Sequence, residues 1–211
     1  MTNVRDMSTI GLLNLAFKLG AVATLSYFAY GALGEWQKNP SRITLLLAVF
    51  SACVSVTVSL ASRKPTTRNM SPLAVFLTLG ATYYYPALVL TPGEHLIPEI
   101  AGAAIQTVGI CWEIYSKLSL GRSFGMLPAH RAVVVRGAYR HVRHPIYLGY
   151  FLHYLGFLLT NFGWQNGAIY TGLFIMLILR IFLEEDVLKR EDPSYLRYCR
   201  RVRFRLVPFI F

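Results

Sequence analysis

Long apolar segments separated by short polar or basic loops are the feature that most constrains this sequence. The first of them, Leu12–Leu33, is long enough to cross a hydrocarbon layer of roughly 30 Å. Inside lipid every backbone N–H and C=O group needs an internal partner, and a helix supplies one. We therefore predict an all-α, polytopic bundle of five to six transmembrane helices, at about Leu12–Leu33, Ile43–Leu60, Pro72–Leu90, Glu99–Leu118, Pro145–Thr160 and from near Ala168 past Leu183.

The composition agrees with a single integral membrane domain that covers residues 1–211. Of the 211 residues, 55% are hydrophobic and 15% are charged, which is apolar for a water-soluble domain. The net charge is +11, and the positive charge lies in loops between apolar segments. This favours anionic membrane lipids as partners and argues against nucleic acid. The widely spaced Cys53, Cys111 and Cys199 predict reduced thiols. The sequence leaves the oligomeric state open.

The distribution of basic residues predicts the orientation of the bundle. Ser62–Ser71, Lys117–His144 and the tail Glu191–Phe211 are basic, whereas the turns Thr91–Pro98 and Asn161–Gly167 contain no Lys or Arg. By the positive-inside rule, both termini and the long loop face the cytoplasm, with the amphipathic tail on the cytoplasmic surface. Both termini on one side require an even number of crossings, and the last two helices either cross or form a hairpin. We expect a multi-pass protein of a prokaryotic cytoplasmic membrane rather than of the endoplasmic reticulum.

A basic loop leads into an apolar helix within Gly137–Tyr150. Pro145 suits the first turn of a helix and disfavours helical geometry at His144. We therefore expect a loop through His144, a helix from Pro145, and free backbone N–H groups beside His141, Arg143 and His144 that attract an anion or a carboxylate. The alternative is an ordinary interfacial helix start with snorkelling cations.

The same stretch resembles a known family signature. Arg143-His144-Pro145-Ile146-Tyr147-Leu148-Gly149 is similar to the Arg-His-Pro-x-Tyr-x-Gly motif of the isoprenylcysteine carboxyl methyltransferases and their phospholipid N-methyltransferase relatives. Later positions resemble the family's Glu-Glu-x-x-Leu and Tyr-x-x-Tyr block, namely Glu184, Glu185, Leu188, Tyr195 and Tyr198. Gly121–Phe124 and Val135–Tyr139 fit its pattern too, except that Ala138 stands where Pro is more usual.

The resemblance implies a membrane enzyme that transfers a methyl group from S-adenosylmethionine to the carboxylate of a lipid-like or prenylated acceptor. The catalytic half would span about residues 117–211, with its active site facing the cytoplasm. Arg143 and Arg180 are the expected catalytic residues, with Arg180 steering an anionic acceptor. The expected cofactor-binding residues are Tyr139, His144, Pro145, Tyr147, Leu148, Gly149, Glu184 and Glu185.

Methyl transfer from a sulfonium needs alignment and a dry site, but neither a metal nor a covalent nucleophile. The cofactor requires carboxylates for its ammonium, cations or N–H groups for its carboxylate, and an aromatic or apolar slot for adenine. The predicted residues supply these groups. No metal is expected, because His141 and His144 lack the spacing of a metal site. No Gly-x-Gly-x-x-Gly motif follows a strand, so a Rossmann site is not expected.

One face of the fourth apolar segment carries Gly102, Gln106, Gly109 and Glu113. The spacing allows close helix packing through the glycines, with Glu113 paired to Lys117, and we prefer this interpretation. The alternative is a polar wall of the active site. His153 is expected to be a packing or interface residue rather than a ligand.

Three other functions compete with the carboxyl methyltransferase. The nearest is N-methylation of a phospholipid headgroup. An NADPH-dependent membrane sterol reductase can show a similar Arg-His-Pro-x-Tyr element, but the Glu184-Glu185 pair argues against it. A non-enzymatic lipid-binding scaffold would leave these acids near the membrane without a purpose.

Overall fold

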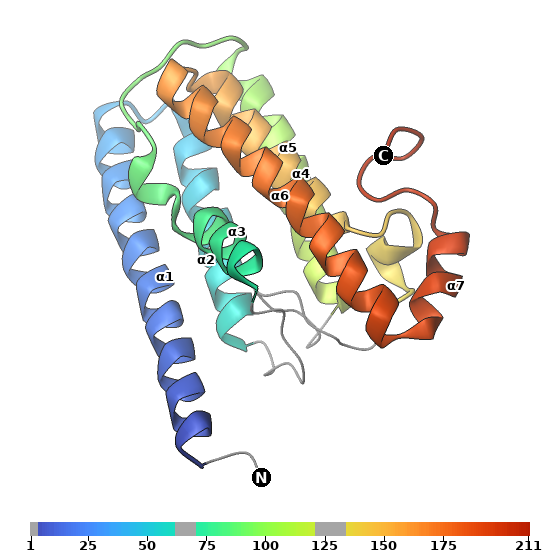
Figure 1. The fold of residues 1–211 in the computed structure, drawn as a ribbon. Coiled ribbons are helices and arrows are strands. Elements are labelled where there is room, and N and C mark those ends of the chain that lie inside the picture. The colour runs from blue at the N-terminus through green and yellow to red at the C-terminus, as the bar shows by residue number, and fades with distance from the viewer. Residues whose placement is uncertain (1–3, 62–70, 121–133) are drawn as a thin grey trace.

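The computed structural model describes residues 4–61, 71–120 and 134–211, and these fold into an α-helical bundle (Figure 1). The described part contains no strand beyond one isolated bridge, so the expected all-α class is confirmed. The helices are α1 (Val4–Lys38), α2 (Ile43–Ala61), α3 (Pro72–Tyr83), η1 (Tyr85–Ala87), α4 (Glu99–Leu120), η3 (Gly137–Arg140), α5 (Pro145–Thr160), α6 (Trp164–Glu191) and α7 (Pro193–Arg201).

The third predicted helix extends beyond the observed one. The apolar segment Pro72–Leu90 was expected to be one helix, but α3 ends at Tyr83 and a short 3-10 turn follows. Pro86 accounts for the difference, since it lacks an N–H group and disfavours helical geometry at the residue before it. With 12 residues, α3 is shorter than a helix that crosses a bilayer by itself.

The sixth predicted helix starts earlier than expected. The sequence predicts a turn through Gly167, but α6 begins at Trp164 after the extended residue Gly163. The Asn166 side chain is buried, donating to the Val89 and Asn161 carbonyls and accepting from the Val89 N–H. A residue typical of turns is therefore held in the first turn of a helix by contacts distant in sequence.

α4 and α5 pack closely against each other. An added Cβ at Gly109 would lie 2.5 Å from the His153 backbone nitrogen, and one at Gly156 would lie 2.6 Å from the Gly102 carbonyl oxygen. Glycine is required at both positions because the two backbones approach so closely. The predicted packing role of the α4 glycines is thus confirmed, and it fixes where the first turn of α5 lies.

Loops that the sequence predicts to be on one side of the membrane meet at one end of the bundle, away from α7 (Figure 1). Glu94 and Phe162 exchange both backbone hydrogen bonds, at 2.8 and 3.0 Å. The buried guanidinium of Arg42 donates to the Leu90 carbonyl and to Asn161 Oδ1. This grouping agrees with placing these loops on one side of the membrane.

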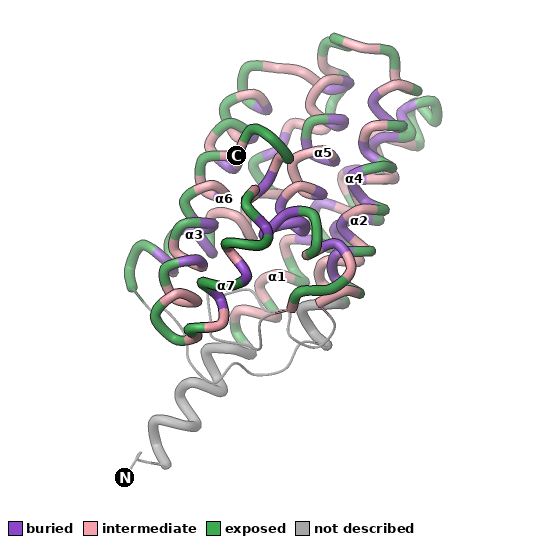
Figure 2. The backbone as a smooth tube through the Cα atoms, turned by 90° about the vertical axis from the view of Figure 1, so that its right-hand side faces the viewer, coloured by how far each residue is buried: buried purple, intermediate pink, exposed green. Residues whose placement is uncertain are grey.

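Among the described residues, one helix passes a test of length and apolarity for crossing a membrane, namely α6, Trp164–Glu191. Ile43–Thr57 and Pro72–Tyr83 are shorter apolar helical stretches. Figure 2 shows buried positions where the helices meet and exposed positions on the outside. Many exposed residues are apolar, such as Ile100, Val108 and Ile175. The number of crossings remains a prediction from the sequence.

Candidate active site

The first turn of α5 meets the charged end of α6 in a cluster of ionisable side chains. The Tyr147 hydroxyl donates to Glu184 Oε1, and Arg180 Nη2 lies 3.4 Å from the same oxygen. The Arg180 guanidinium also lies over the Tyr147 ring, 5.7 Å from its centroid. Two predicted site residues, Tyr147 and Arg180, therefore meet at the carboxylate of a third, Glu184, whose side chain is 22% exposed.

Glu185 is the buried counterpart of Glu184, with a side chain only 1% exposed. Its Oε1 accepts from Arg143 Nε at 2.8 Å, and its Oε2 accepts from Lys189 Nζ at 3.0 Å. Arg205 Nε lies 3.3 Å from Oε2. Glu185 therefore joins the loop before α5, the end of α6 and the C-terminal tail through one carboxylate.

His144 lies between the two carboxylates. Its Nδ1 is 3.8 Å from Glu184 Oε2, and its Nε2 is 3.4 Å from Glu185 Oε1. The ring stacks on Tyr147 with a centroid distance of 5.9 Å. His144 Nε2 is buried and makes no hydrogen bond of good geometry within the described part of the chain. A buried polar atom without such a bond is costly, and a ligand at this position would relieve that cost.

The backbone N–H groups beside the histidines are not free, so this part of the expected anion cradle is wrong. The Arg143 N–H donates to the Phe204 carbonyl at 3.0 Å, and the His144 N–H donates to the Arg205 carbonyl at 2.8 Å. The His141 N–H donates to the Ala138 carbonyl within the η3 turn. The C-terminal tail thus accepts two backbone hydrogen bonds from the loop, a contact across some sixty residues that no local pattern indicates.

The unusual Ala138 fits the local geometry. Its side chain is buried, and its N–H donates to Ser119 Oγ at 3.3 Å, a bond that Pro at this position would lose. Gly137 before it has φ +59°, a left-handed conformation that glycine adopts at no cost. The similar segment Gly121–Phe124 lies outside the described residues.

Tyr139 lies in the η3 turn, and its carbonyl accepts from the Tyr198 hydroxyl at 2.8 Å. Burial first, and then the nearby Glu184 carboxylate, raises the pKa of the Tyr139 phenol well above its usual value. The phenol is therefore a neutral hydrogen-bond donor at physiological pH. Tyr195 and Tyr198 of α7 form a small buried cluster with Val202.

Three of the predicted cofactor residues do not point at the carboxylates. Pro145 is buried at the start of α5. Gly149 faces α4, where an added Cβ would lie 2.8 Å from the Cβ of Glu113. Leu148 also faces α4 and lines a separate pocket. The structure therefore brings together Tyr139, Arg143, His144, Tyr147, Arg180, Glu184 and Glu185, while the other three shape the helix that carries them.

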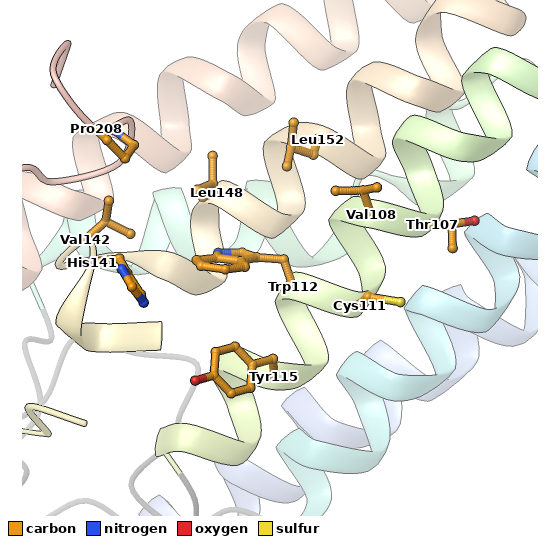
Figure 3. Close-up of a pocket in the computed structure, with 10 residues that line it drawn as sticks. All are labelled: Thr107, Val108, Cys111, Trp112, Tyr115, His141, Val142, Leu148, Leu152 and Pro208. Carbon is orange, nitrogen blue, oxygen red and sulfur yellow. The ribbon is translucent and has the colours of Figure 1, made fainter. Parts of the chain in front are cut away.

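The pocket has a volume of about 740 Å³ and lies between α4 and α5, next to the loop that carries His144 (Figure 3). Trp112 lies across its middle, with His141 and Val142 at one end and Thr107 and Cys111 toward the other. Its lining is mostly apolar: Thr107, Val108, Cys111, Trp112, Tyr115, His141, Val142, Leu148, Leu152 and Pro208. Because Pro208 is far from α4 in sequence, the sequence patterns did not indicate this pocket.

A second charged network lies inside the bundle, where the sequence indicated only a pair. Glu113 forms the expected ion pair with Lys117. Its carboxylate also accepts from Ser55 Oγ at 2.9 Å and from Ser51 Oγ at 3.1 Å, and His153 Nδ1 is 3.6 Å away. His153, expected to be a packing or interface residue, is therefore part of an ionic network. Within the described residues, no group of three or more His, Cys, Asp or Glu side chains could hold a metal ion.

Comparisons with known proteins agree with this arrangement. Residues 98–191, from the start of α4 to the end of α6, match the family model for phospholipid methyltransferases. A solved structure, described as the eukaryotic intramembrane Ras methyltransferase, isoprenylcysteine carboxyl methyltransferase, without a monobody, has a similar fold, with a TM-score of 0.57 and 20% sequence identity. The similarity covers 99% of this chain and 88% of that chain. No curated protein matches at the level of sequence.

The matched segment contains the glycine-packed α4–α5 pair, the His144–Pro145 loop and the Glu184–Glu185 pair. The resemblance predicted from the motifs is thereby confirmed. The chain carries a segment that matches the phospholipid methyltransferase family model, within a fold similar to that of an isoprenylcysteine carboxyl methyltransferase.

Proposed function

We propose that this enzyme transfers a methyl group from S-adenosylmethionine to the carboxylate of a lipid-like acceptor of the isoprenylcysteine type. The observation that carries the proposal is the charge balance of the site. Among the described residues, four cations surround two carboxylates: Arg143, Arg180, Lys189 and Arg205 around Glu184 and Glu185. Such an excess of positive charge favours anionic groups, both on the acceptor and on the cofactor.

The residues at the site fit the cofactor. When bound, S-adenosylmethionine supplies an electrophilic methyl group on a sulfonium. Glu184 is the accessible carboxylate, so we propose that it receives the cofactor ammonium. His144 has a buried ring nitrogen without a good hydrogen bond, so we propose that it donates to a cofactor oxygen. The rings of Tyr139 and Tyr147 supply apolar surface beside these two groups.

Glu185 and Arg143 have a different role in this proposal. Both are buried and form an ion pair, and Glu185 also pairs with Lys189 and Arg205. A buried pair of this kind holds structure in place, because removing one partner leaves an uncompensated charge. We propose that Glu185 positions the His144 loop, that Arg143 acts on the reaction through the same loop, and that Arg180 orients the acceptor carboxylate.

The pocket between α4 and α5 supports a lipid-like acceptor. Its apolar lining suits a hydrocarbon chain, and His141 and Val142 at one end are in the loop that leads to His144. An acceptor whose chain fills this pocket would have its polar end near the charged cluster. We propose that it arrives sideways from the bilayer, on the cytoplasmic side.

Phospholipid headgroup N-methylation is the second candidate, because the family match is to phospholipid methyltransferases. An ethanolamine acceptor must lose a proton from its ammonium during methylation, and the surplus of cations does not favour that group. Its phosphate, however, is an anion that Arg180 would attract equally well.

Base lability of the transferred methyl separates the two candidates. The purified protein in lipid nanodiscs is incubated with methyl-labelled S-adenosylmethionine and either a farnesylated N-acetylcysteine or phosphatidylethanolamine. Carboxyl methylation gives an ester that releases labelled methanol in mild base, whereas an N-methyl group is retained. We expect base-labile label on the farnesylated acceptor. Base-stable label on phosphatidylethanolamine alone would replace our proposal with the second candidate.

A further inference from the structure

The last residues of the chain fold into a tight hairpin, Leu206–Phe211. The N–H groups of Leu206 and Val207 both donate to the Phe211 carbonyl, and the Ile210 and Phe211 N–H groups donate back to Val207. Phe209, at the tip, has φ 67°, a left-handed conformation that is uncommon for a residue other than glycine. The hairpin is thus a defined structure that holds its tip in one conformation.

The tip of the hairpin is apolar and exposed. Phe209 is 90% exposed and Ile210 is 82% exposed, whereas Leu206 at the base is buried. Phe211 packs on Phe182 of α6 with a centroid distance of 6.0 Å. The Arg205 guanidinium lies over both rings, at 5.2 and 5.3 Å from their centroids. The base is therefore fastened to α6, and the tip stays largely exposed, although the Phe209 ring lies 5.2 Å from the Phe204 ring between centroids.

The hairpin continues an apolar strip on the outside of α6. Ile175, Leu179 and Phe182 lie on one helical face and are all exposed. After α7 the chain turns back, and Figure 1 shows its C-terminal end beside the bundle, level with α5 and α6 rather than beyond their ends. In a membrane protein an exposed apolar strip of this kind faces acyl chains, and the tip lies next to it.

α7 and the residues directly after it carry positive charge. Arg197, Arg200, Arg201 and Arg203 are all exposed. None of the four forms an ion pair with a residue in the described part of the chain. Exposed arginines beside an exposed apolar tip form the pattern of a segment that binds anionic headgroups and dips into the acyl boundary.

We propose that the hairpin inserts Phe209 and Ile210 into the acyl-chain region of the cytoplasmic leaflet, while the four arginines bind anionic phospholipid headgroups. The insertion matters for the active site because the same tail holds it together. Phe204 and Arg205 accept the backbone bonds of Arg143 and His144, and Pro208 forms part of the pocket wall. The lipid surface thereby becomes a third support of the His144 loop, beside α6 and α7.

Nitroxide accessibility measures the depth of the tip. Labels are attached at Phe209→Cys and Ile210→Cys in the full chain with its native cysteines replaced, in vesicles of phosphatidylcholine and phosphatidylglycerol. The control positions are Ile175→Cys on the lipid-facing strip and Arg201→Cys on α7. We expect both tip labels to resemble Ile175, with a ratio of oxygen to nickel-chelate collisions several-fold above that at Arg201. Tip labels that match Arg201 would overturn the insertion.

Lipid selectivity tests the arginines without using enzyme activity. Spin-labelled phosphatidylglycerol and phosphatidylcholine are compared for the fraction immobilised by the protein. The wild type should immobilise a larger fraction of phosphatidylglycerol, and the variant Arg197→Gln, Arg200→Gln, Arg201→Gln, Arg203→Gln should lose most of that preference. An unchanged preference would overturn the role of these arginines. Neither measurement depends on methyl transfer, so their failure is distinct from failure of the proposed reaction.

Discussion

Two charged networks in the same apolar bundle differ in how completely they are closed. The inner network surrounds Glu113, which is 0% exposed and whose two carboxylate oxygens both accept hydrogen bonds from serine or lysine. The outer network surrounds Glu184 and Glu185, where Glu184 is accessible and His144 Nε2 lacks a good hydrogen bond within the described chain. A closed network holds helices in register, and an open one has capacity left for a ligand.

The difference also explains why both networks occur on the same helix. α5 carries His153 into the inner network and, two turns earlier, Tyr147 and the end of the His144 loop into the outer one. The rings of Tyr147, Tyr150 and His153 form a ladder between them, with centroid distances of 6.1 and 6.5 Å. The inner network therefore fixes the helix whose first turn builds the site.

The largest expected effect comes from opening the inner network. Glu113→Ala leaves Lys117 and His153 buried without their counter-charge, and breaking a buried ion pair in this way costs about 3–5 kcal/mol. We expect a loss of stability of that size, measured by thermal unfolding in detergent. Asp186→Asn, an exposed acid on α6, is the matched control and should change little. A stable Glu113→Ala variant would show that the inner network does not hold the bundle together.

Substitutions of His144 and His153 should have different effects, because the two residues belong to different networks. His144→Ala should lower cofactor affinity about tenfold or more, since a hydrogen bond to a charged group is worth about 1.5–3 kcal/mol, and it should lower stability less than His153→Ala does. His153→Ala should lower stability and leave the affinity of the folded fraction close to wild type. Calorimetric titration and thermal unfolding of both variants check this. The same change in both quantities for both variants would contradict the division into a closed and an open network.

An added methyl group should lower stability at Gly109 of α4 but not at Gly172 of α6. An added methyl at Gly109 would meet the His153 backbone, so Gly109→Ala should cost about 1–3 kcal/mol through overpacking. Gly172 has nothing within 4 Å of an added Cβ, and Gly172→Ala should be neutral or slightly stabilising. Equal thermal midpoints for the two variants would mean that α4 and α5 are not in the close contact described.

The smallest expected effect is at the support of the η3 turn. Tyr198→Phe removes one hydrogen bond, to the Tyr139 carbonyl, and a bond of this kind contributes about 1 kcal/mol. We expect a fall in stability of that order and a modest fall in cofactor affinity. Tyr30→Phe, at a tyrosine of α1 that is 83% exposed, should leave the cofactor affinity unchanged in the same titration.

Much of the fold was predictable because it depends on local patterns. The apolar lengths gave the bounds of α2, α4 and α5 to within a few residues, and Pro145 marked the start of α5. The end of α3 also has a local signal, because Pro86 indicates a break in the helix. Spacing likewise indicated the Glu113–Lys117 pair and the Arg180–Glu184 pair.

What the sequence could not show depends on contacts between distant segments. The N–H groups of Arg143 and His144, expected to be free, donate to the tail carbonyls of Phe204 and Arg205. Nothing in the sequence near either segment predicts this pairing. The family resemblance implies that Glu185 is a second cofactor carboxylate, whereas its ion pairs with Arg143, Lys189 and Arg205 are visible only in three dimensions. Ser51 and Ser55 reach Glu113 from another helix for the same reason.

The central claim is that neighbouring acids on α6 have different roles, with Glu184 binding the cofactor and Glu185 positioning the loop. The direct test measures S-adenosylmethionine affinity and thermal stability for Glu184→Gln and Glu185→Gln, since Gln keeps the shape and removes the charge. We predict that Glu184→Gln weakens affinity about tenfold or more at wild-type stability, by loss of a charge-assisted bond. Glu185→Gln should lower stability as well as affinity. Wild-type affinity in a folded Glu184→Gln protein would contradict the account.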